Sequence, residues 1–474
     1  MPHSETFTIP FLKEPAHRVV FENGHTLLFV PRRGPAFNVS TWVKTGSVHE
    51  NDQNSGVSHF LEHLMFKGTE RFKPGEFDRR MESRGAVINA ATWKDFTFYY
   101  VTAPKGTAPN GEGTDNLNEV LDLHADMLLH STLPDAEIGP AYNPDDPHYA
   151  GEKRERAVVI EEIGMREDQP WTRVFNAVNH RMYPTGHPYQ RDVIGTRQII
   201  GQIPRAEIEH YYKTWYSAPN MTTIVVGDFD QAYVVERVQT YFDFHRRSNG
   251  VAPGKRLQVA DVPLLPERPA DTTLQRLEGD YQTHFVMMAF HAPPVTNLRE
   301  SIALDVASYI LGEGHSSRLV QTLLEQVKKP NYNSVSCGQS TFSLGNTFYI
   351  QGNFLSSDVT ASLGELTGEL ERFLHDAPMT QDEFERAVKK LKVDFADTSE
   401  TASGIAEALG DAVTVANSLG HYTQYLDTLA SLDLETVHQV ARRYLAPSQA
   451  YTTVLVPKQG SARGQAPAEE VHVS

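Results

Sequence analysis

An internal repeat is the feature of this sequence that most restricts its fold. The stretch WYSAPNMTTIVVGDF at residues 215–229 is similar to RYLAPSQAYTTVLVP at residues 443–457, and Pro219 and Pro447 are 228 positions apart. In both stretches an amphipathic helical pattern leads through a proline turn into a Thr-Thr pair and an apolar run of strand type. Because this spacing is close to half of the 474 residues, we expect two homologous halves.

Strand and helix patterns follow the same coarse order in each half, which predicts the α+β class. Between the halves, residues 246–270 are rich in proline, glycine and charge, as is typical of a linker. We therefore expect a first domain at residues 1–245, the linker, a second domain at residues 271–458 and a disordered tail at residues 459–474.

The composition is that of a soluble globular protein and excludes several classes of function. The net charge of −17 argues against nucleic acid or an anionic membrane as the main partner. No apolar run reaches the ~18 residues of a membrane span, and the N-terminus lacks the pattern of a secretory signal. The single cysteine, Cys337, excludes an internal disulfide and a cysteine-based zinc cluster. We expect a cytoplasmic protein without membrane insertion, with a cysteine-poor periplasmic protein as the alternative.

The stretch SHFLEHLMF at residues 58–66 predicts a metal site. His59 and His63 are four residues apart, so on a helix they share one face and their imidazoles can reach the same ion. Glu62 lies beside that face, where a carboxylate can accept a proton from water without being a ligand. The neighbouring side chains are mostly apolar, and burying this polar trio without a partner would cost several kcal/mol. A metal removes that cost, and His-x-x-Glu-His is the inverted order of the zinc protease helix.

A catalytic zinc ion takes three protein ligands and keeps one position open, so a third ligand is needed. In EKRERAVVIEEIGMREDQP at residues 152–170, Glu155 and Glu162 are two helical turns apart on one face. Glu161 is rotated by about 100° from that face and suits a solvated surface, whereas apolar residues flank Glu162. Glu162 is therefore the expected third ligand, and Glu155 is expected to support a histidine or the helix.

These residues and several further segments resemble the pitrilysin-type (inverzincin) metallopeptidase family, in its half-length branch that includes mitochondrial processing peptidase and related bacterial peptidases. The resemblance covers nearly the whole chain. Besides the inverted zinc helix and the Glu-x6-Glu pair, it includes GAVINAAT (85–92), GHPY (186–189), the segment Tyr216–Asp228 and ILGEGHSSRL (310–319).

The resemblance implies two homologous domains, each with a mostly antiparallel sheet packed with helices, of which only the first is catalytic. It also implies a role for each candidate residue. His59, His63 and Glu162 resemble the ligands of one Zn2+ per chain, Glu62 resembles the general base, and Glu155 resembles the supporting carboxylate.

Two residues outside the zinc motifs are implied in substrate binding. Asn89 and Ala90 match the positions at which the family holds the substrate backbone beside a sheet edge, although Asn89 also fits a turn. His180 and His187 are alternative ligands by residue type. Neither has a histidine partner at helical spacing, so turn or core roles are expected for both.

The second half lacks the zinc motif, because LDVASYILG at residues 304–312 contains no histidine or glutamate. The family's partner half offers an arginine and, after six residues, a tyrosine that grip the substrate. Leu324 stands at the arginine position and Tyr332 is one residue out of register, and a hydrophobic side chain cannot stabilise an oxyanion. We therefore expect a heterodimer with a homologous subunit that supplies the Arg/Tyr pair around a closed chamber. A homodimer that uses Lys328 or Lys329 is the alternative.

The leading hypothesis is a zinc-dependent endopeptidase that hydrolyses peptides or unfolded polypeptide segments. The alternatives are a non-catalytic structural subunit, like the core proteins of respiratory complexes, and a metal-stabilised peptide-binding module. A scaffold has no reason to retain His59, Glu62, His63 and Glu162 together. The measurements that separate the three are zinc content and hydrolysis: a scaffold binds no zinc, and a binding module holds zinc without cleaving peptides.

Overall fold

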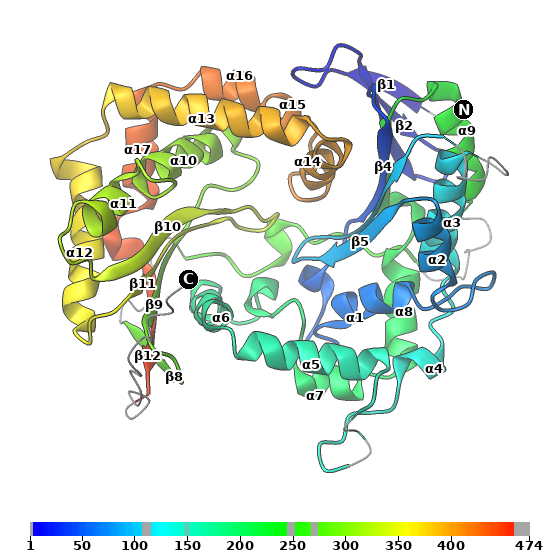
Figure 1. The fold of residues 1–474 in the computed structure, drawn as a ribbon, viewed down its shortest axis with the longest axis horizontal. Coiled ribbons are helices and arrows are strands. Elements are labelled where there is room, and N and C mark those ends of the chain that lie inside the picture. Colours follow the sequence, from blue (N-terminus) through cyan, green and yellow to red (C-terminus); the bar gives the residue numbers. More distant parts are fainter. Residues whose placement is uncertain are drawn as a thin grey trace, which may run out of the picture.

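The computed structural model describes residues 3–106, 115–146, 149, 151–243, 252–266 and 274–458. The tail at residues 459–474, expected to be disordered, lies outside these residues, and so does part of the linker at 246–270. Two sheets, one from each half of the chain, dominate the described part (Figure 1).

Within the described residues the first sheet has seven strands and the second has five. The first sheet has the order β1 (His3–Phe7), β2 (Ala16–Val20), β3 (Thr26–Pro31), β7 (Met221–Gly227), β4 (Ala36–Val43), β6 (Thr97–Pro104) and β5 (Val87–Thr92). The second has the order β10 (Tyr332–Ser340), β11 (Thr347–Phe354), β9 (His284–His291), β12 (Tyr451–Pro457) and β8 (Gln275–Gly279).

The two sheets repeat one topology, which confirms the expected α+β class with two similar domains. The order β3-β7-β4-β6-β5 in the first sheet corresponds to β8-β12-β9-β11-β10 in the second. In each, the last strand in sequence pairs parallel to the first of these five strands, and the other pairs are antiparallel. The repeated Thr-Thr segments form β7 and β12, which lie between two neighbours and are therefore apolar.

Helices cover both sheets. Those of the first half are α1 (Val57–Met65), α2 (Glu76–Ser83), α3 (Asn116–His130), α4 (Asp135–Ile138), α5 (Glu155–Glu167), α6 (Pro170–Met182), α7 (Arg197–Gln202), α8 (Arg205–Trp215) and α9 (Gln231–Tyr241). Those of the second half are α10 (Leu298–Leu311), α11 (Arg318–Val320), α12 (Val359–Glu371), α13 (Gln381–Ser399), α14 (Ala402–Thr414), α15 (Gly420–Thr423), α16 (Tyr425–Ala430) and α17 (Leu434–Tyr444). Among these described helices, none is both long and apolar enough to span a bilayer.

Each half lends one helix to the sheet of the other half. Helix α6 of the first half packs on β9 and β12, and α14 of the second half packs on β4 and β7. Val178 of α6 shares a buried cluster with Leu455, and Leu409 of α14 shares one with Trp42. The two halves therefore complete each other's cores. The expected domain boundaries, residues 1–245 and 271–458, stay a prediction.

The contact of α14 with the first sheet gives a stability prediction. A Cβ on Gly410 would lie 1.9 Å from the Trp42 ring, so glycine is needed for this close approach. We expect Gly410→Ala to lower the free energy of unfolding by about 1–3 kcal/mol because of overpacking.

The matched control is Gly364→Ala on α12, where an added Cβ meets nothing within 4 Å. Helix propensity alone predicts a gain of up to about 1 kcal/mol there. Urea unfolding measures both, and stabilisation by both variants would contradict the close packing.

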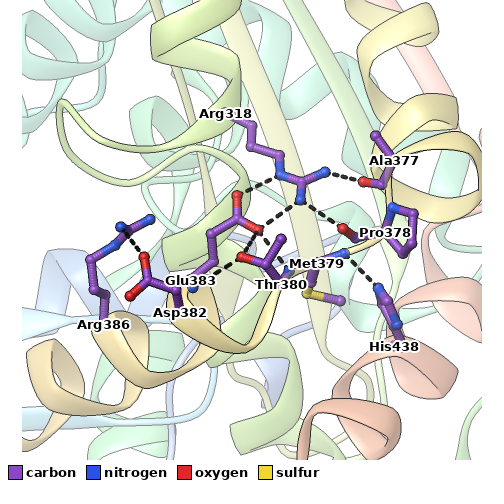
Figure 2. Close-up of polar contacts among 9 residues, drawn as sticks. All are labelled: Arg318, Ala377, Pro378, Met379, Thr380, Asp382, Glu383, Arg386 and His438. Atoms are coloured by element: carbon purple, nitrogen blue, oxygen red, sulfur yellow. Dashed lines mark hydrogen bonds and ion pairs between the residues drawn. The ribbon is translucent and has the colours of Figure 1, made fainter.

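The segment ILGEGHSSRL contains an arginine, Arg318, with a structural role. Arg318 donates from Nε and Nη2 to the Glu383 carboxylate at 2.8 and 2.7 Å (Figure 2). The same guanidinium binds the carbonyl oxygens of Ala377 and Pro378. Glu383 in turn forms a capping box with Thr380 at the start of α13. Arg318 therefore fastens the start of α11 to the start of α13.

Candidate active site

The candidate zinc helix, α1, is held firmly at its N-terminus. Glu50 accepts hydrogen bonds from the backbone N–H of Gly56 at 2.7 Å and of Ser58 at 2.9 Å, and from the Ser58 hydroxyl. A carboxylate at this end also interacts favourably with the helix dipole. Gly56 has φ +92°, and a Cβ there would lie 2.5 Å from the carbonyl oxygen of Ile194. These contacts fix the position of the N-terminus of α1, and with it the direction in which the polar face of the helix points.

Helix α5 brings a carboxylate to the two histidines of α1. One ligating atom from each of His59, His63 and Glu162 lies within 4.8 Å of the others. The Nε2 atoms of both histidines are 3.6 Å from Glu162 Oε2. Ligands bonded to one zinc ion at 2.0–2.1 Å in tetrahedral geometry are about 3.4 Å apart. The three side chains thus suit a zinc ion in both donor type and spacing, whereas Glu161 is exposed.

Glu155 and Lys67 orient His63. Glu155 Oε2 lies 3.1 Å from His63 Nδ1, and Lys67 Nζ binds the other oxygen of Glu155 at 2.7 Å. With Nδ1 donating to the carboxylate, the neutral form of the His63 ring offers the lone pair of Nε2 to a metal ion. His59 differs, because its Nδ1 is buried and no described residue forms a hydrogen bond with it.

The protonation of the three candidate ligands reflects these contacts. Burial lowers the pKa of His59 to about 4, so its imidazole is neutral at pH 7. Burial also lowers the pKa of His63, but the hydrogen bonds with Glu155 and Glu162 outweigh it and raise that pKa to about 9. The hydrogen bond with His63 lowers the pKa of Glu162 to about 2. A cation that binds here therefore displaces a proton from His63.

Glu62 lies in position to act as a base. Its Oε2 accepts a hydrogen bond of 2.5 Å from the Thr92 hydroxyl at the end of β5. Burial raises the pKa of Glu62, with the Thr92 hydroxyl opposing the shift. A carboxylate whose pKa moves towards neutrality takes and returns a proton more readily at pH 7.

Asn89 and Ala90 lie on β5, the edge strand of the first sheet. Asn89 is exposed, and its side-chain oxygen accepts a hydrogen bond of 2.9 Å from the Ala90 N–H. Because β5 continues to Thr92, this edge leads to Glu62. The strand can therefore offer backbone groups to an extended peptide close to the candidate base.

The other candidates in the first half stay outside this group of ligands. His180 lies on α6, and His187 caps a short 3-10 turn, where its Nδ1 accepts a hydrogen bond from Tyr189 N. Neither belongs to the group formed by His59, His63 and Glu162.

The position in the second half that corresponds to the family's tyrosine offers no free hydroxyl to a substrate. Tyr332 is 1% exposed, and its hydroxyl donates to the carbonyl oxygen of Ser362 at 2.7 Å. Leu324 is half-buried, whereas Lys328 and Lys329 are exposed. Tyr332 is thus a core residue, whereas Lys328 and Lys329 are accessible cations of this stretch.

Four contacts of the site were missed by reasoning from the sequence. They involve Glu50, Lys67, Thr92 and Arg166. Arg166 donates from Nε to Glu162 Oε1 at 3.1 Å. Because Arg166 follows Glu162 by four residues on one helix, the sequence could have predicted this ion pair. Glu50 and Lys67 had no such signal, because their partners are set by the packing of α1.

The contact between Glu155 and His63 gives a second prediction. We expect Glu155→Gln to weaken zinc affinity by about 10–100-fold, because an amide orients the imidazole less well than a carboxylate. Isothermal titration with zinc measures the change. Glu152→Gln is the matched control, because Glu152 pairs with Arg154 beside the start of the same helix. Unchanged affinity in Glu155→Gln would remove its supporting role.

Two protein families match this chain in succession. Residues 32–197 match the family described as Insulinase (Peptidase family M16), and residues 202–391 match the one described as Peptidase M16 inactive domain. The first match contains all the candidate zinc residues, and the second lies largely in the half that lacks them.

Individual relatives include both proteases and a subunit of another complex. Zinc protease PqqE of Helicobacter pylori is 27% identical over 456 residues, 94% of this chain and 93% of that protein. Mitochondrial-processing peptidase subunit beta of Lentinula edodes is 24% identical over 86% of this chain and 82% of its own. Cytochrome b-c1 complex subunit 1 of Bos taurus is 25% identical over 61% of this chain and 54% of its own. A crystal structure of a Helicobacter pylori protease has the same fold, with a TM-score of 0.76, 24% identity and coverage of 96% of this chain and 100% of the other.

Proposed function

Since this chain belongs to peptidase family M16, we propose that it is a zinc-dependent endopeptidase that hydrolyses peptides or unfolded polypeptide segments. The observation that carries the proposal is the convergence of His59, His63 and Glu162 within 4.8 Å. The charge of Glu62 interacts with both His63 and Glu162. A relative named as a zinc protease that aligns with 94% of the chain supports it.

The residues divide the chemistry among them. His59, His63 and Glu162 would hold the ion, which supplies a Lewis acid that polarises the scissile carbonyl and acidifies water. Glu62 accepts a proton from the attacking water and delivers it to the departing amine nitrogen. Thr92 holds the Glu62 carboxylate in place through its hydroxyl. Glu155 keeps the His63 ring oriented.

Substrate binding is assigned to the edge strand. Asn89 and Ala90 on β5 would pair with the backbone of an extended peptide. This mode selects unfolded segments, because a folded substrate has no free strand to add to the sheet. The exposed position of Asn89 supports the assignment.

The complete enzyme is proposed to contain a second homologous subunit. At the two positions that correspond to the Arg/Tyr pair, this chain has the apolar Leu324 and Tyr332, whose hydroxyl is buried. A heterodimer partner would supply that pair across a closed chamber, and a homodimer that uses Lys328 or Lys329 is the alternative. A relative that is itself named as a subunit, the peptidase subunit beta, supports the first arrangement.

Zinc content and turnover test the proposal together. We expect about one zinc per purified chain and cleavage of unfolded peptides that a chelator stops and added zinc restores. Robust turnover by the chain alone at concentrations where it is monomeric would remove the need for a partner. Absence of zinc would favour a structural subunit. The similarity to cytochrome b-c1 complex subunit 1 is an argument for that alternative. Zinc without any cleavage, also after co-purification of partners, would indicate a binding module.

A further inference from the structure

A cavity of about 330 Å³ lies between the two halves, and one of its lining residues, Arg166, binds the candidate zinc ligand Glu162. Its lining includes Trp93, Arg166, Trp171, Phe175, Arg191 and Tyr349. Tyr349 belongs to β11 of the second sheet, and the others belong to the first half. The cavity exists only because the two halves pack together.

Two covalent or hydrogen-bonded links join this cavity to the catalytic groups. Trp93 follows Thr92, whose hydroxyl binds Glu62. Arg166 lines the cavity and binds Glu162, a candidate zinc ligand. A peptide held at the zinc site can therefore place a neighbouring side chain in the cavity.

Most of the apolar lining is aromatic, and neighbouring rings hold two of these side chains. Trp171 packs edge-on against Phe285 of the second half, with ring centroids 5.2 Å apart. Trp93 stacks near Phe342, also of the second half, at 6.5 Å. Because neighbours hold both indoles, the cavity is largely preformed and suits a bulky apolar or aromatic side chain.

The charged part of the lining leaves two arginines for a ligand. Lys94 donates to the carbonyl oxygens of Tyr189 and Arg191, and Asp192 accepts a hydrogen bond of 2.6 Å from Asn176 Nδ2. The charges of Lys94 and Asp192 also attract each other. Arg191 pairs with Asp52, whose side chain is 94% exposed and does not line the cavity. Arg166 uses Nε for Glu162, and among the described residues no other hydrogen bond involves its guanidinium. The Arg166 side chain is 43% exposed.

On the basis of the proposed peptidase function, we propose that this cavity selects peptides that carry a carboxylate next to a bulky apolar residue. Arg166 and Arg191 bind the carboxylate, and the aromatic walls bind the apolar side chain. The carboxylate is that of an aspartate or glutamate side chain, or that of a free C-terminus. The overall charge of −17 would instead attract basic peptides. The proposal therefore requires that the two arginines in the cavity outweigh the electrostatic potential of the whole protein.

Binding to the zinc-loaded Glu62→Gln chain tests this selection without requiring turnover. The probes are fluorescein-labelled decapeptides with one phenylalanine and with Glu, Gln or Lys placed one or two residues to either side, all amidated at the C-terminus. We expect at least one Glu peptide to bind about tenfold tighter than its Lys counterpart, because charge-assisted hydrogen bonds to arginine are replaced by repulsion. A Gln peptide with a free C-terminus is the second arm. Tighter binding of only this peptide identifies the terminal carboxylate as the group recognised.

Two substitutions and one matched control assign the preference to the cavity. In the Glu62→Gln chain, Arg166→Gln and Arg191→Gln are each expected to reduce the Glu-to-Lys affinity ratio by at least about threefold. Arg197→Gln is the control, because Arg197 is 41% exposed and pairs with Glu167 as Arg166 pairs with Glu162. It does not line the cavity, and the ratio should not change. Zinc content is measured in every variant, because Arg166 contacts a candidate ligand.

The outcomes separate this inference from the proposed peptidase function. Equal binding of the Glu, Gln and Lys peptides, with no gain from a free C-terminus, would overturn the inference, as would tighter binding of the Lys peptides. A preference that survives both cavity substitutions would overturn it too. Cleavage of the same peptides by the unsubstituted zinc-loaded chain tests the peptidase function on its own. A carboxylate preference in binding would stand even if that cleavage were absent.

Discussion

Replacing Glu62 by glutamine is expected to lower peptide hydrolysis by about 10²- to 10⁴-fold while zinc stays bound. The amide cannot accept the proton of water, but it has nearly the same shape and can still accept the hydrogen bond from Thr92. His59, His63 and Glu162 are untouched, so zinc affinity should change little. Steady-state cleavage of a quenched fluorescent peptide and zinc analysis of the same sample measure both effects.

The control for Glu62→Gln is Glu161→Gln, the same change at an exposed position of α5. It is expected to leave both cleavage and zinc content unchanged. Full activity in Glu62→Gln would remove Glu62 as the base. Loss of zinc together with activity would show that Glu62 acts on the metal site and not on the proton.

Replacing Glu162 by glutamine is expected to weaken zinc binding by at least about 100-fold, because a neutral amide replaces the anionic ligand. The two histidines would remain, without the carboxylate whose Oε2 lies 3.6 Å from each Nε2. Since zinc binds the folded state, a 100-fold loss of affinity also removes about 2.7 kcal/mol of zinc-dependent stabilisation. Competition with a fluorescent chelator measures the affinity, and thermal unfolding with and without zinc measures the stabilisation.

Glu167→Gln is the matched control for Glu162→Gln. Glu167 lies on the same helix but pairs with Arg197 at the surface, so its replacement should leave zinc affinity unchanged. If Glu162→Gln kept the zinc affinity of the unsubstituted chain, the third ligand would have to be another residue, and the assignment of α5 to the site would be wrong.

Local spacing explains why much of the candidate site could be predicted from the sequence. Residues four apart on a helix share a face whatever the rest of the fold does, so His59 and His63 follow from the pattern alone. The same rule separates Glu162 from Glu161, and Glu161 is indeed exposed. The repeat containing Pro219 and Pro447 likewise predicted two similar sheets, because the same pattern of turn and strand leads to the same pairing.

Contacts between distant segments could not be predicted in this way. The hydrogen bond between Thr92 and Glu62 joins a strand end to a helix, and no spacing rule connects them. The expectation that Tyr332 is merely one residue out of register also missed its burial against Ser362. Such contacts depend on how α1 and the second sheet pack, which is set by the sum of many apolar contacts over the whole chain.

The sequence by itself determined the two-fold repeat, the α+β class and the face of α1 that carries two imidazoles and a carboxylate. These features arise from short periodic patterns whose geometry the backbone dictates. Only the tertiary structure decided that Glu162 reaches the histidines, that α6 and α14 each cover the sheet of the other half, and that Arg166 and Arg191 line one cavity. The physical reason is that these contacts join residues far apart in the chain, whose meeting depends on packing the whole core at once.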